Sequence, residues 1–161
     1  MSLSPRRATA VVFAAYAVLL LEVLLNPSPA APSRLVAVVA EVGARAGLPA
    51  VLVAAERVEF GLNVAAFAPL SLLGSWLWPR IALAQWTAAG FAGSLLVEIV
   101  QVALPARSAT HADVVANTLG AALGAALGML ALRAARSRAG RPGAGRPGAP
   151  TPGARSPGHP Q

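Results

Sequence analysis

The sequence contains no cysteine, which excludes disulfide bonds, cysteine-ligated zinc and a thiol nucleophile. It also contains no lysine, so all 13 basic residues are arginines. Aromatic residues make up only 5% of the chain and charged residues only 12%. Four of the arginines lie in residues 137–161, where no aromatic side chain is present to stack on a base. The formal net charge of +7 therefore does not indicate a nucleic-acid partner, and we expect none.

Hydrophobic residues are abundant, at 56% of the 161 residues. A soluble domain averages about 45–50% apolar and about 25% charged residues, so this composition indicates a membrane protein. A bilayer-spanning helix needs about 20 apolar residues. Four stretches approach that length, namely residues 8–25, 61–78, 81–104 and 113–132. We predict an all-α, integral membrane four-helix bundle over residues 1–136. Only Pro79 and Arg80 separate the second stretch from the third, which predicts a tight helical hairpin.

The placement of arginines predicts the orientation of this bundle. With four spans, one side of the membrane carries Arg6, Arg7, Arg80, Arg133, Arg136 and Arg138. The arginines of the other side are fewer and are partly offset by glutamates. The positive-inside rule then places both termini in the cytoplasm, and we expect a multi-pass protein of a bacterial plasma membrane. Trp76, Trp78 and Trp86 flank the Arg80 turn, where an inner aromatic belt is expected.

The first apolar stretch also has features of a secretory signal peptide. Arg6 and Arg7 would form the positive region, and the small residues at 28–30 would form the cleavage site. However, the apolar run exceeds the usual length of about 7–15 residues, and Glu22 interrupts its end. We therefore interpret this stretch as an uncleaved helix.

Two segments lie outside the four stretches. In the connection at residues 26–60, Arg34, Glu41 and Arg45 fall on one helical stripe, and apolar residues cover the rest. This pattern predicts a short helix on the outer membrane surface, with a re-entrant segment as the alternative. Residues 137–161 consist mainly of Gly, Pro, Ala and Arg with a repeated GRPGA, which predicts a disordered tail.

Polar residues within membrane helices are informative because a charged group at mid-helix costs about 2.5–3.5 kcal/mol. Under the predicted topology they gather at the external end of the bundle. This predicted cluster comprises Glu59, Asn63, Glu98, Gln101, Arg107, Ser108, Asp113 and Asn117. The charged members would either bind a ligand or clamp the helix ends together by hydrogen bonds. We interpret Asn63 and Asn117 mainly as contacts between helices.

One face of the fourth stretch carries, in order, Asp113, Asn117, Gly120, Gly124 and Gly128. Its glycines form a ridge of small residues, which predicts close packing against a neighbouring helix. The polar end of the same face should therefore point into the bundle. There we expect it to meet Glu98 and Gln101, with Arg107 folding over both carboxylates.

A complete catalytic or metal-binding set is not visible in the sequence. Glu98, His111 and Asp113 lack a diagnostic ligand spacing, and we interpret His111 as a solvated loop residue. Ser108 has neither a convincing general base nor an oxyanion donor. The catalytic residues, if any, are thus unknown, and we expect no metal and no cofactor.

Residues 97–128, VEIVQVALPARSATHADVVANTLGAALGAALG, resemble the signature of the VanZ-like membrane protein family. That signature has a Glu-x-x-Gln pair, a Pro-x-Arg-Ser/Thr loop, an aspartate, and Asn-x-x-Gly followed by another glycine. It is matched by Glu98, Gln101, Pro105, Arg107, Ser108, Asp113, Asn117, Gly120 and Gly124. Upstream, Asn63, Phe67 and Pro69 resemble a second family segment, which departs at Ser71 where a glycine is usual.

The resemblance implies a compact, all-helical membrane protein whose family namesake is an accessory teicoplanin resistance protein. The implied function is action at the external face of the envelope that lowers susceptibility to lipid-tailed glycopeptides. The expected partners are the lipid bilayer and the headgroup of a phospholipid or of a lipid-linked cell-wall precursor. The alternative is a membrane-embedded enzyme that modifies such lipids with Glu98 or Asp113 as acid or base. A channel or transporter is disfavoured because the inner half of the predicted bundle has few polar residues.

Overall fold

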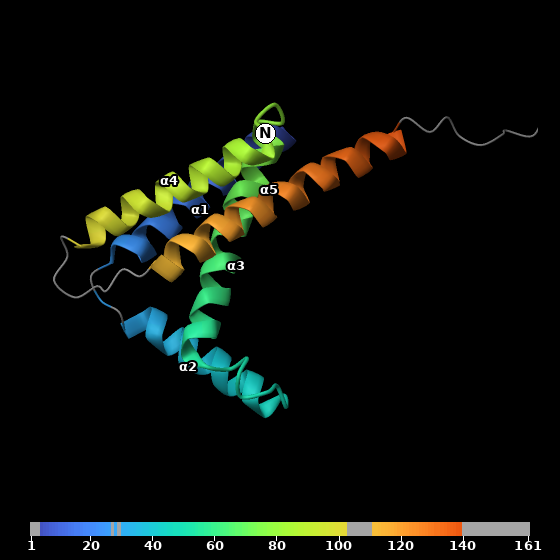
Figure 1. Cartoon of the computed structure of the whole chain (residues 1–161). Coiled ribbons are helices and arrows are strands. Elements are labelled where there is room, and N and C mark those ends of the chain that lie inside the picture. The colour runs from blue at the N-terminus through green and yellow to red at the C-terminus, as the bar shows by residue number, and fades with distance from the viewer. Residues whose placement is uncertain (1–3, 27, 29, 103–110, 140–161) are drawn as a thin grey trace, which may run out of the picture.

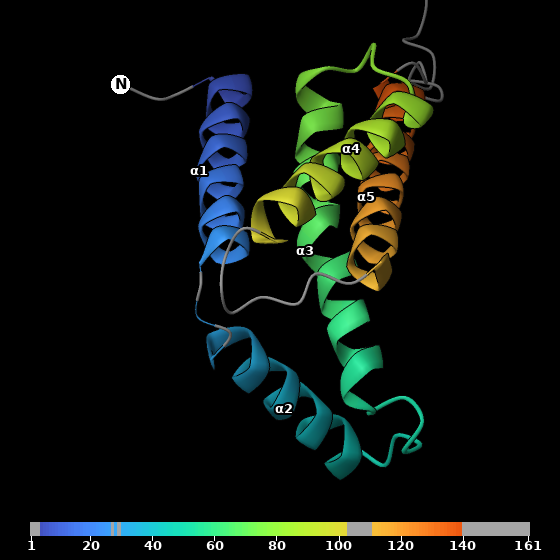
Figure 2. The same cartoon turned by 60° about the vertical axis from the view of Figure 1, so that its left-hand side comes forward.

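The computed structural model describes residues 4–26, 28, 30–102 and 111–139. Over these residues the chain is helical and has no strand, which confirms the predicted all-α class. Figures 1 and 2 show how the helices are arranged. They are α1 (Pro5–Leu25), α2 (Ala30–Arg45), α3 (Ala55–Leu77), α4 (Leu83–Val102) and α5 (His111–Ala139).

The helices α1, α3, α4 and α5 are long and apolar enough to cross a membrane. They coincide with the four predicted stretches, but some of their ends differ. α3 begins at Ala55 rather than at residue 61, because the polar residues before the apolar run are helical too. α4 begins only at Leu83 because a turn at Pro79 and Arg80 and a bend at Ile81 come before it. α5 runs to Ala139, beyond both residue 132 and the predicted boundary at residue 136.

Among the described helices, the most extensive contact is between α3 and α5. Gly120, Gly124 and Gly128 of α5 lie directly against α3. A Cβ atom at Gly124 would overlap the Ala68 carbonyl oxygen and the Ser71 hydroxyl. Small residues at such a contact let two backbones approach closely, which is a common way for membrane helices to associate.

The helix α4 packs against an adjacent part of the same face of α5, again through small residues. A Cβ atom at Gly90 would overlap the methyl group of Ala121. The predicted tight hairpin of α3 and α4 is wrong, because the two helices diverge after their turn and each packs on α5 (Figures 1 and 2). They touch near the turn, where the Trp86 ring covers Gly74.

The helix α1 lies at the edge of the bundle (Figure 2) and leaves most of its apolar side chains exposed. Its exposed residues include Val11 and Val18, which a bilayer would cover. The Tyr16 hydroxyl ties α1 to α3 by donating a hydrogen bond to the Ala66 carbonyl oxygen at 2.8 Å. Pro69 follows Ala66 by three residues in α3, and it has no N–H to donate to a carbonyl oxygen of the preceding turn.

The helix α2 lies across the N-terminal end of α3 (Figure 2), within the segment where a short helix was predicted. It ends in a Schellman motif, with Gly47 at a φ of 82°. The Leu48 N–H donates to the Gly43 carbonyl oxygen at 3.0 Å, as that motif requires. Arg45 and Glu41 form an exposed ion pair at 2.6 Å.

Candidate functional site

Polar side chains from three helices meet where α5 begins. They come from the middle of α3, the second half of α4 and the first turns of α5. The residues are Asn63, Ser94, Asp113 and Asn117, and we call them the polar cluster. Three of the four were predicted from the sequence as members of one site, and Ser94 was not.

The first pair of the polar cluster joins α3 to α5. The Asn63 side-chain amide donates to Asp113 Oδ1 at 2.7 Å, and both residues are partly buried. Asp113 lies in the first turn of α5, where the helix dipole favours a negative charge. This contact therefore holds a carboxylate at the point where α5 enters the bundle.

The second pair joins α4 to α5 and is almost completely buried. The Asn117 side-chain amide donates to the Ser94 hydroxyl at 2.8 Å. Asn117 is 4% exposed and Ser94 is 3% exposed. Asn117 Oδ1 is buried and has no hydrogen-bond partner among the described residues. The amide thus uses its donor side and leaves an acceptor oxygen inside the bundle.

Gln101 does not meet the polar face of α5 as predicted. It is buried, and its side-chain amide donates to the Leu24 carbonyl oxygen at 2.6 Å. The last carbonyl groups of a helix have no partner within that helix, and Leu24 belongs to the last turn of α1. Gln101 therefore binds the end of α1, and Ser94 takes the place opposite Asn117.

The remaining predicted site residues are not part of this hydrogen-bonded cluster. Glu98 is half-buried, one turn after Ser94, and makes no hydrogen bond or ion pair with the described residues. Glu59 is exposed in α3, one turn before Asn63. His111 is exposed and is the first residue of α5 rather than part of a loop. Arg107 and Ser108 lie outside the described residues.

Ser94 could have been found from the sequence by its spacing. It lies four residues before Glu98 and seven before Gln101 in the second half of α4, which is otherwise apolar, so the three share one face. Within the described residues, no group of three or more His, Asp or Glu side chains is placed to hold a metal ion.

The VanZ/LLP1 family model matches residues 13–132. This range runs from the middle of α1 into α5 and includes the whole polar cluster. No curated protein and no solved structure matches the chain. Because the family match covers well over half of the sequence, this chain belongs to the VanZ/LLP1 family, and it is a multi-pass membrane protein.

Proposed function

We propose that this protein acts at the external face of a bacterial plasma membrane. There its polar cluster binds the headgroup of a phospholipid or of a lipid-linked cell-wall precursor. This binding lowers susceptibility to teicoplanin-type, lipid-tailed glycopeptides. Family membership and the four long apolar helices support the general class. The more specific proposal rests on Asn117.

The observation that carries the proposal is the buried Asn117 Oδ1, which has no hydrogen-bond partner within residues 4–26, 28, 30–102 and 111–139. A buried polar atom without a partner costs about 1–3 kcal/mol, so its presence favours a role other than packing. Asp113 lies one turn away on the same helical face, so a carboxylate and an amide oxygen follow each other along α5. Both are acceptors, which suits the hydroxyl or ammonium groups of a headgroup. Arg107, predicted from the sequence, supplies the cation for a phosphate.

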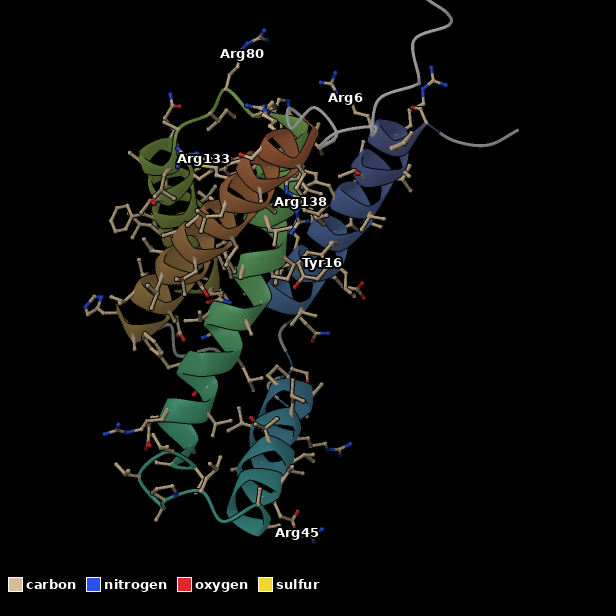
Figure 3. All side chains as sticks on the ribbon, turned by 90° about the vertical axis from the view of Figure 1, so that its right-hand side faces the viewer. Arg6, Tyr16, Arg45, Arg80, Arg133 and Arg138 are labelled. Atoms are coloured by element: carbon tan, nitrogen blue, oxygen red, sulfur yellow. The ribbon has the colours of Figure 1, made fainter. Side chains whose placement is uncertain are left out.

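The distribution of arginines supports the proposed orientation. Figure 3 shows Arg6 and Arg80 at one end of the molecule and Arg45, the last residue of α2, at the opposite end. By the positive-inside rule, the end with Arg6 and Arg80 is cytoplasmic. The polar cluster lies toward the other end, where α5 begins, and would therefore lie nearer the external leaflet.

The test is teicoplanin and vancomycin susceptibility in a sensitive Gram-positive host that expresses matched membrane levels of each variant. The variants are wild type, Asn117→Leu, Arg107→Ala and the control Thr118→Val. The control removes a neighbouring hydroxyl that donates only to the Val114 carbonyl of its own helix at 2.6 Å. We expect wild type and control to raise teicoplanin tolerance and the other two variants to lose it.

Stability must be measured alongside. Asn117→Leu loses one hydrogen bond with a net value of about 1 kcal/mol and removes an unpaired acceptor that costs about 1–3 kcal/mol. Leucine also leaves the buried Ser94 hydroxyl without this partner, so the terms oppose one another and the free energy of unfolding should change by no more than about 2 kcal/mol. Loss of tolerance in a well-folded Asn117→Leu protein supports the headgroup site. Full tolerance in both Asn117→Leu and Arg107→Ala, or no tolerance with wild type, contradicts it.

The enzymatic alternative uses the same region, with Glu98 or Asp113 as acid or base. It differs in its product, because an enzyme would leave a covalently altered lipid or precursor in the cell. Comparison of the lipids and precursors of a deletion strain with those of its parent separates the two ideas. Identical profiles would leave binding as the mechanism.

A further inference from the structure

A cleft with a volume of about 440 Å³ lies between the start of α1 and the end of α3, far from the polar cluster. Its polar rim consists of Ser4, Arg6 and Arg7. Its apolar wall includes Phe13 and Trp78. The cleft therefore combines two cations with an aromatic surface at one end of the membrane-spanning helices.

Contacts between the helices fix the shape of this cleft. The Phe13 and Trp78 rings meet edge to face, with centroids 5.3 Å apart. Trp78 is also adjacent to Trp86, at 6.4 Å between centroids. One N–H of Arg6 donates to the Leu77 carbonyl oxygen at 3.4 Å. Figure 3 shows Arg6 at the same end of the molecule as Arg80.

Both arginines retain donors for a ligand. A guanidinium group has several N–H donors, and Arg6 uses one of them on Leu77. Arg7 makes no hydrogen bond or ion pair with the described residues, and its side chain is exposed. A guanidinium matches the geometry of a phosphate oxygen pair, which a compact ammonium group does not.

The charge around the cleft is unopposed. The acidic residues of the entire sequence are Glu22, Glu41, Glu56, Glu59, Glu98 and Asp113. None of them falls in residues 1–21 or 60–97, which include every residue that lines the cleft. An anion bound there would therefore meet two guanidinium groups and no competing carboxylate from the cleft wall.

From this geometry we propose that the cleft binds the phosphodiester headgroup of an anionic phospholipid. Arg6 and Arg7 bind the phosphate, and the Phe13 and Trp78 rings contact the glycerol and the first carbons of the acyl chains. A lipid is the occupant, rather than a free phosphate, because the cleft lies at the ends of two membrane spans and has a largely apolar wall. The tryptophan belongs at headgroup depth, where such rings gather. The site is independent of the function proposed for the polar cluster.

The bound lipid would strengthen the attachment of α1 to the bundle. Among the described residues, α1 has fewer contacts with its neighbours than α5 has, and most of its side chains are exposed. The lipid phosphate would be held from α1, while its glycerol would rest on Trp78 at the end of α3. A single ligand would then connect two helices at the end opposite the Gln101 contact.

The experiment uses purified, delipidated full-length protein in mild detergent and measures bound lipid by native mass spectrometry. Phosphatidylglycerol is titrated against phosphatidylcholine with the same acyl chains and against inorganic phosphate. The variants are Arg6→Ala with Arg7→Ala, and the control pair Arg136→Ala with Arg138→Ala. The control removes the same charge from exposed positions of α5 that do not line the cleft.

We expect wild type to prefer phosphatidylglycerol, and the Arg6/Arg7 double variant to bind it about tenfold or more weakly. The Arg136/Arg138 control should stay within about twofold of wild type. Equal losses in both double variants would mean diffuse surface attraction and would overturn the proposal. Binding of inorganic phosphate as tight as that of the lipid would overturn it as well, as would no loss in the Arg6/Arg7 variant.

A second variant tests the space in the cleft without changing its charge. Its folding is checked in the same experiment. Ala10 is exposed and lines the cleft, and Ala10→Trp fills the space while leaving both arginines in place. We expect this variant to lose the preference for phosphatidylglycerol although its helical content and oligomeric profile match wild type. If Ala10→Trp binds the lipid as well as wild type does, the cleft is not the site.

Discussion

Gly124 and Gly93 are both helical glycines, but their surroundings are opposite. Gly124 faces α3, where an added Cβ atom would overlap a backbone oxygen that cannot move aside. Gly93 is exposed on α4, and an added Cβ atom would meet nothing within 4 Å. The same residue type is therefore needed for contact at one position and only lowers helix propensity at the other.

This difference predicts opposite effects of one substitution. Gly124→Ala should destabilise the protein by about 1–3 kcal/mol, because the α3 and α5 backbones must move apart. Gly93→Ala should be neutral or stabilise it by up to about 1 kcal/mol. Unfolding of both variants in detergent micelles, followed by circular dichroism, measures the two changes. A Gly124→Ala protein as stable as Gly93→Ala would show that α3 and α5 do not pack on the glycine ridge.

Individual residues also mark the limit of what the sequence could predict. The spacing of Asn63, Asp113 and Asn117 indicated a common end of the bundle, because such residues are costly in apolar helices. The hydrogen-bond partners of these residues on α4 could not be derived from the sequence. Which face of α4 meets α5 depends on how the helices rotate when they pack, and the structure puts Ser94 opposite Asn117 and turns Gln101 toward α1.

At the scale of the helices, apolar runs predicted the number and the approximate positions of the long helices. They did not predict that α3 and α4 diverge. A short connection favours antiparallel neighbours, but the small-residue faces of α5 allow closer contact with each of them. The order of helices in the sequence was therefore a weaker guide than the position of the glycines.

We predict separately that the helix α2 lies on the membrane surface. Its exposed apolar side chains include Leu35 and Val42, whereas Arg34, Glu41 and Arg45 share another face. A helix with two such faces lies in the interface with its apolar face toward the lipid. The chain contains no cysteine, so a single introduced cysteine can carry an environment-sensitive dye at a chosen position.

We expect a dye on Val42→Cys to show a blue-shifted emission in lipid vesicles and quenching by brominated lipid. A dye on Ala44→Cys, in the same turn but on the other side of the helix, should report water. Water-like emission from both positions would mean that α2 stands away from the membrane. Lipid-like emission from both would favour the re-entrant alternative.

At the scale of the whole molecule, the two ends differ in charge and in chemistry. One end carries Arg6 and Arg80 (Figure 3) and the cleft that Arg6 lines. The other end carries α2 (Figure 2), and the polar cluster lies toward it. This asymmetry could be predicted from the sequence, because arginine positions and apolar lengths are both local properties. The ligands that each proposed site can reach depend on the leaflet that its end of the molecule faces.

The orientation is therefore the property to test on the intact protein in cells. Ala50→Cys places a thiol in the exposed connection between α2 and α3, and Ser137→Cys places one in the last turn of α5. With both termini in the cytoplasm, a membrane-impermeant maleimide should label Ala50→Cys in intact cells and Ser137→Cys only after lysis. The cysteine-free parent provides the blank. The opposite pattern would place the polar cluster in the cytoplasm, and a cluster there could not act on glycopeptides outside the cell.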